Sequence, residues 1–110
     1  MTSYIEIKTT TETKEEAKNI AQHLVGEKLA ACVQILGPIT STYRWKGKVE
    51  VAEEWLCLIK TRENLYQDVE KAIKEKHSYE TPEIIAVPIV EGSGEYLAWI
   101  NNEAKNKAAK

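Results

Sequence analysis

The heptapeptide HSYETPE, residues His77–Glu83, gathers several side chains that could take part in chemistry. His77 ends a stretch of helical periodicity, where the carbonyl end of the helix dipole favours a cation, so one interpretation is a simple helix cap. The other interpretation makes His77 a metal ligand, with Glu83 as an oxygen donor and Tyr79 beside them. One imidazole with carboxylates predicts weak, exchangeable binding of copper or zinc and no required cofactor.

The other reactive side chains are weaker candidates for a functional site. His23 falls on the polar side of a predicted helix and is expected in solvent, and Cys32 and Cys57 read as small buried hydrophobic residues within strands. Lys48 and Lys60 are candidates for holding an anionic ligand. The sequence shows no recognisable pair of nucleophile and base and no acid–base pair of carboxylates, so it predicts a binding protein and not an enzyme.

Composition limits the class of protein. The chain has 110 residues, 43% hydrophobic and 29% charged, which predicts a single domain over residues 1–110. The net charge is −2 and no basic stripe is present, which argues against a nucleic-acid partner. The sequence contains no apolar run long enough for a membrane helix and no secretory signal pattern, so we expect a cytoplasmic protein without a membrane partner.

Two helices must position these residues. Alternating polarity predicts a first strand over Tyr4–Thr10, and Thr13 with Glu16 forms a capping box that starts an amphipathic helix reaching Leu29. Asn64 is expected to cap a second helix, which leads into the HSYETPE segment.

The remaining elements are strands and a short terminal helix. The segment Ala31–Trp45 reads as a strand with a bend at Pro38, and it pairs across a turn at Gly47 with Val49–Thr61. A fourth strand is predicted over Ile84–Val90, and a short helix capped by Ser93 runs through Trp99. The order β-α-β-β-α-β plus a helix predicts an α+β, ferredoxin-like fold, with the first and third strands central and both main helices on one face.

The second face of this sheet would carry no helix, yet it is apolar. In the third strand Trp55, Cys57 and Ile59 alternate with Leu56 and Leu58, so both faces need burial. We therefore expect a second copy of the chain to cover this face.

The hairpin formed by the second and third strands has arms of about 15 residues, roughly three times the common strand length. It is expected to overhang its own domain and to carry Tyr43 and Trp45 towards a neighbouring chain.

Five blocks in order, EKLAACVQI, YRWKGKVE, EEWLCLIKT, HSYETPEII and YLAWI, resemble the CutA family of divalent-cation tolerance proteins. The resemblance implies a homotrimer, an architecture similar to PII signalling proteins and a link to copper and other divalent cations. Thr9 stands where some members carry a cysteine, and Lys76 where some carry a second histidine. The resemblance, with these departures, implies weak metal binding.

Two functions follow from these observations. The first is a trimeric, cytoplasmic divalent-cation tolerance protein with His77 and Glu83 as metal ligands. The alternative is a PII-like regulatory module that binds a small anionic ligand in clefts between subunits. The residues expected to line such a cleft are Tyr43, Trp45, Lys60 and Tyr79.

Overall fold

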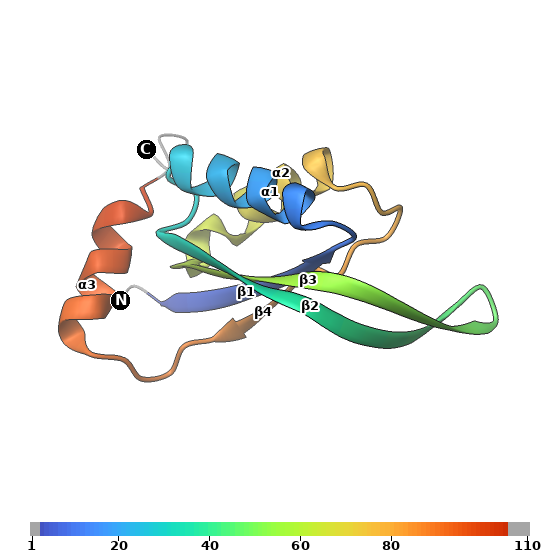
Figure 1. Cartoon of the computed structure of the whole chain (residues 1–110). Helices are drawn as coiled ribbons and strands as arrows, with labels where there is room; N and C mark the ends of the chain where they lie inside the picture. The colour runs from blue at the N-terminus through green and yellow to red at the C-terminus, as the bar shows by residue number, and fades with distance from the viewer. Residues whose placement is uncertain (1–2, 106–110) are drawn as a thin grey trace.

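The computed structural model describes residues 3–105 of the chain. The elements are β1 (Tyr4–Thr11), α1 (Lys14–Gly26), β2 (Cys32–Trp45), β3 (Lys48–Arg62), the 3₁₀ turn η1 (Glu63–Leu65), α2 (Tyr66–Lys76), β4 (Ile85–Pro88) and α3 (Gly94–Glu103). The sheet is antiparallel in the order β2-β3-β1-β4, so the two predicted central strands are confirmed. Helices α1 and α2 lie together on one face, as the ferredoxin-like prediction required (Figure 1). Within residues 3–105, no helix is both long and apolar enough to cross a membrane.

The main core lies between these two helices and the sheet. Ile7 and Ile59 project from the two central strands, and Leu24 and Ile73 project from the helices; all four side chains are fully buried. The strand residues follow a period of two and the helix residues a period of 3.6, which is why the sequence pattern located them.

The two helix starts differ from the predictions in one respect each. Thr13 caps α1 as expected, because its hydroxyl accepts from the backbone N–H of Glu16 at 3.1 Å. The reciprocal half of the capping box is wrong, since the Glu16 carboxylate accepts from Ser78 instead. The Asn64 cap is also wrong: Asn64 lies inside η1, and α2 follows Leu65 with no side-chain cap. Leu65 is fully buried, so packing fixes this helix start.

The predicted long hairpin is confirmed. Strands β2 and β3 have 14 and 15 residues, and their pairing shifts once, between Leu36 and Ile39, at the predicted bend. Lys46 and Gly47 both adopt positive φ, 51° and 81°, which closes the tight turn. Figure 1 shows the tip of this hairpin extending well beyond α1 and α2.

The face of the sheet without helices, here called the open face, carries a group of apolar side chains as predicted, beside Glu6 and Lys8 of β1. The strand pairing places Leu36, Leu56 and Leu58 on it, together with Ile85 and Val87 from β4. Leu36 and Ile85 are nearly half exposed in the single chain. Strand β4 is shorter than the predicted range 84–90. The self-association expected from this face stays a prediction.

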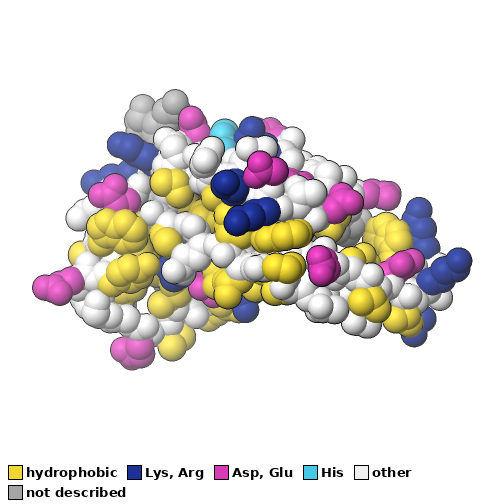
Figure 2. Space-filling model, in the orientation of Figure 1, with side chains coloured by type: hydrophobic (Ala, Val, Ile, Leu, Met, Phe, Trp, Pro, Cys, Tyr) yellow, Lys and Arg dark blue, Asp and Glu magenta, His cyan; other side chains and the backbone are white. Residues whose placement is uncertain are grey.

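A second, smaller core lies at the end of the sheet opposite the hairpin tip. There Ile100 of α3 and Ala104, which directly follows the helix, pack against Ala31 and Leu65. Its outer side leaves Tyr96 and Trp99 about 40% exposed. Figure 2 shows hydrophobic side chains gathered at this end and basic side chains at the hairpin tip.

Candidate functional site

A cavity of about 660 Å³ opens between the hairpin and the segment His77–Glu83. We call this segment the corner and the cavity the corner pocket. The hairpin supplies two aromatic rings and a carboxylate, and the corner supplies a phenol and two carboxylates. These lining residues are Tyr43, Trp45, Glu54, Tyr79, Glu80 and Glu83.

The strand pairing explains why these residues meet. Thr10 pairs with Leu56, and Glu54 stands two residues before Leu56 on the same strand, so both Thr10 and Glu54 belong to the open face. Tyr43 pairs with Glu50, which lies an even number of residues before Glu54 on β3, so Tyr43 is on the same face of the sheet as Glu54. Trp45, two residues after Tyr43, is on that face as well. The corner then passes the end of β1 and closes the pocket from the side. The polar pocket therefore adjoins the apolar part of the open face.

Glu54 is the buried carboxylate among the lining residues that the sequence analysis missed. It is only 5% exposed, and its Oε2 accepts a hydrogen bond of 2.8 Å from the Tyr79 hydroxyl. In the described part of the chain, no hydrogen bond or ion pair reaches its other oxygen. The sequence could have identified Glu54, because it lies at the same alternating positions as Leu56 and Leu58 and so places a carboxylate beside apolar side chains.

The surroundings of Tyr79 are strongly negative. Burial, the hydrogen bond to Glu54 and the charges of Glu54 and Glu12 raise the pKa of Tyr79 well above its usual value. The phenol therefore remains protonated at every physiological pH and acts as a fixed hydrogen-bond donor to the pocket carboxylate.

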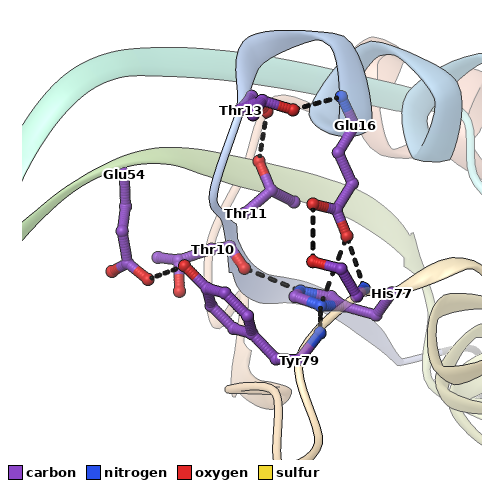
Figure 3. A network of polar contacts seen from close by, with 8 residues as sticks. Thr10, Thr11, Thr13, Glu16, Glu54, His77 and Tyr79 are labelled. Atoms are coloured by element: carbon purple, nitrogen blue, oxygen red, sulfur yellow. Dashed lines mark hydrogen bonds and ion pairs between the residues drawn. The ribbon is translucent and has the colours of Figure 1, made fainter.

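His77 is not among the residues that line the pocket. Figure 3 shows its ring between Thr10, Glu16 and the backbone of Tyr79. Its side chain is fully buried; Nε2 lies 2.7 Å from the Thr10 carbonyl oxygen, and Nδ1 accepts from the backbone N–H of Tyr79 at 3.1 Å. With Nδ1 accepting, Nε2 is the nitrogen that donates its hydrogen to the Thr10 carbonyl. The metal-ligand role of His77 stays a prediction, and in this conformation it requires Nδ1 to exchange the Tyr79 hydrogen bond for a metal.

Glu16 ties the same corner to the first turn of α1. Its Oε2 accepts from the Ser78 backbone N–H at 2.7 Å, and its Oε1 accepts from the Ser78 hydroxyl at 3.1 Å. Oε2 also lies 3.5 Å from Nδ1 of His77. Figure 3 shows the resulting chain of contacts from α1 through the corner to Tyr79 and Glu54 on β3. The corner is thus held at three points before any ligand arrives.

The predicted cleft residues separate into two groups. Tyr43, Trp45 and Tyr79 line the corner pocket, as does the predicted metal ligand Glu83, and all four belong to one chain. The contribution of a neighbour's hairpin to this wall stays a prediction. Lys60 lies elsewhere on β3. Its ammonium is 3.5 Å from the Glu6 carboxylate and also donates to Gln34.

The soft metal donors lie inside the sheet. Burial, assisted by the charge of Glu16, raises the pKa of the Cys57 thiol to about 11, so Cys57 is an inert thiol at neutral pH. Thr9 is fully buried beside Cys57 in the strand pairing, and its hydroxyl has no hydrogen-bond partner. Among residues 3–105, no three side chains of His, Cys, Asp or Glu are grouped to hold one metal ion.

The comparisons with known proteins agree with this architecture. A family model described as CutA1 divalent ion tolerance protein matches residues 5–103. The chain belongs to this family. It is 45% identical over 91 residues to the divalent-cation tolerance protein CutA of Thermus thermophilus, covering 83% of this chain and 88% of that relative. It is also 44% identical over 93 residues to the chloroplastic protein CutA of Arabidopsis thaliana, covering 84% of this chain and 51% of that relative.

Solved structures of the CutA1 family share the fold over nearly the whole chain. The periplasmic divalent cation tolerance protein CutA from Archaeoglobus fulgidus is 42% identical, with a TM-score of 0.90, and the match covers 93% of this chain and 99% of that one. CutA1 from Oryza sativa gives 42% identity and a TM-score of 0.91, covering 94% of each chain. The chain spans about half the length of the curated plant relatives that it matches.

Proposed function

We propose that this chain serves in divalent-cation tolerance by binding divalent cations weakly, as a binding protein without catalytic activity. The observation that carries the proposal is the charge of the corner pocket, because its charged lining residues are Glu54, Glu80 and Glu83. Carboxylates without a cationic neighbour attract a cation. The relatives' names, divalent-cation tolerance protein, support the same class of ligand.

The donor set explains why the binding is weak. Oxygen ligands dominate the pocket, and the one nearby imidazole, His77, is engaged in two hydrogen bonds. Copper(II) and zinc gain affinity from nitrogen and sulfur donors. A site formed by Glu83, water and a His77 that must first give up a hydrogen bond should therefore have a dissociation constant of roughly micromolar or weaker. The metal is a transient ligand in this proposal.

Calorimetric titration with zinc tests the proposal. Glu83→Gln and Glu54→Gln each remove one pocket charge at nearly constant shape, and Glu91→Gln removes an exposed charge that does not line the pocket. We expect both pocket variants to weaken zinc binding by about tenfold, whereas the control matches the wild type. Equal affinities for all four proteins would refute a zinc site in the pocket.

The expected homotrimer belongs to the same proposal. The apolar open face, with Leu36 and Ile85 half exposed in the single chain, supports burial against further copies. Light scattering at micromolar concentration should give three times the 12.5 kDa chain mass, and a stable monomer would contradict it. A cytoplasmic location also stays a proposal, since relatives are named chloroplastic and periplasmic.

The alternative of a small anionic ligand loses support at this pocket. Lys60, the cation expected to hold such a ligand, pairs with Glu6 away from the pocket. An anion entering between Glu54, Glu80 and Glu83 would meet repulsion from like charges.

A further inference from the structure

The corner pocket is far larger than a single metal ion requires. Its volume of about 660 Å³ falls within the range of sites that bind small organic molecules. We infer that this pocket binds a small aliphatic polyamine, a molecule with two or three protonated amino groups. This ligand class goes beyond the divalent cation proposed above and is tested independently of it.

Charge selects a polyvalent cation. Three lining residues are carboxylates, and the lining includes no lysine, arginine or histidine. Glu54 is the most informative of the three, because it is 5% exposed and its second oxygen, which has no partner among the described residues, is still open to solvent. A buried carboxylate is costly unless a cation or a set of hydrogen-bond donors compensates it. An ammonium group supplies both, since it carries the charge and three N–H donors.

The two aromatic rings select an ammonium group over a bare metal ion. Tyr43 and Trp45 line the same pocket and are about 40% exposed in the single chain. Ammonium groups bind the faces of such rings, and tryptophan binds them best. The ammonium of Lys46 already lies over the Trp45 ring, 5.8 Å from its centre, so a bound ligand must displace it or use the other face of the ring.

The rest of the lining suits a molecule that carries several amino groups. Hydroxyl and carboxylate groups are spread over both walls, so separate ammonium groups find acceptors on the hairpin and at the corner. The hydroxyl-bearing lining residues are Thr10, Ser41, Thr42, Ser78 and Thr81. The Tyr79 phenol is already committed to Glu54, so it holds that carboxylate in place for an incoming cation.

Spermidine is the probe for this inference, and triethylene glycol is a neutral chain of similar length. Titration of the full chain in its native assembly, at physiological salt, is followed by calorimetry and by the indole N–H signal of Trp45 in NMR spectra. We expect spermidine to bind and to shift the Trp45 signal, whereas triethylene glycol does neither. Glu54→Gln and Trp45→Ala should each weaken spermidine about tenfold, and Glu91→Gln should leave the affinity unchanged.

Three outcomes would overturn the inference. They are absence of spermidine binding, an equal response to triethylene glycol, and equal affinities of the wild type, Glu54→Gln and Trp45→Ala proteins. The wild-type comparison of the two probes needs no substitution, so a folding defect in a variant cannot decide the result. Zinc binding without spermidine binding would support the proposed function and overturn this inference. Spermidine binding without zinc binding would support this inference and overturn the proposed function.

Discussion

Replacing His77 with alanine tests whether this residue positions the corner. The substitution removes the hydrogen bond to the Thr10 carbonyl and the one from the Tyr79 backbone N–H. Each is worth about 1 kcal/mol net, and Thr10 is 6% exposed, so its carbonyl has little access to replacement water. Loss of a fully buried ring adds about 1 kcal/mol for the cavity. We therefore expect the free energy of unfolding to fall by about 3 kcal/mol per chain.

Chemical denaturation at one fixed chain concentration measures this loss, since the concentration affects the stability of any assembly. His77→Gln is the matched variant, because its side-chain amide can donate to the Thr10 carbonyl from a position near that of Nε2. We expect His77→Gln to recover at least about 1 kcal/mol of the loss. A stability of His77→Ala within about 0.5 kcal/mol of the wild type would refute the positioning role, and so would a glutamine variant no better than alanine.

Three further predictions concern the strands and their buried groups. Gly37→Ala should lower the free energy of unfolding by about 1–3 kcal/mol in chemical denaturation, because the added Cβ would lie 2.5 Å from Trp55, whereas Gly26→Ala, with open space around it, should not destabilise the protein. Thr9→Val should raise the free energy of unfolding, obtained from thermal denaturation, by about 1 kcal/mol, because it removes a buried hydroxyl that has no hydrogen-bond partner. A lower free energy of unfolding would show that the hydroxyl has a partner. The pKa of Cys57 rises from 9.0 to about 11 on folding, so between these values the unfolded chain loses the thiol proton and the folded chain keeps it. The free energy of unfolding should therefore fall by about 2 kcal/mol between pH 9 and pH 11, and Cys57→Ala should show a smaller decline over that range.

Most of the fold was predictable because its signals are local and repeated. Strand alternation and helical periodicity placed the elements in order, and the double apolar character of β3 identified the open face. The corner was also recognisable, because Pro82 and a histidine at a helix end mark a defined turn. The errors at Asn64 and at the end of β4 arise where packing, which a single sequence does not display, decides an element boundary.

The candidate site was predictable only in part, because its contacts join residues distant in sequence. Glu16 satisfied a local capping rule, yet its carboxylate binds Ser78, 62 residues later. Lys60 looked available as a cation until the strand pairing placed it opposite Glu6. The side chains that meet at the pocket follow from strand register combined with the path of the corner, and neither is fixed by spacing along the chain.

Glu54 gives the clearest indication that the corner pocket has a function. On the open face its neighbours along β3 are Leu56 and Leu58, and an apolar residue at this position would continue their row without the desolvation cost of a carboxylate. The surrounding structure instead directs Tyr79 onto Glu54, and it holds Tyr79 through His77. A carboxylate that is costly to bury, supported by residues from the corner and open towards a cavity, is what a cation-binding site requires. The same arrangement makes His77 important for the pocket even when its ring nitrogens bind only the protein.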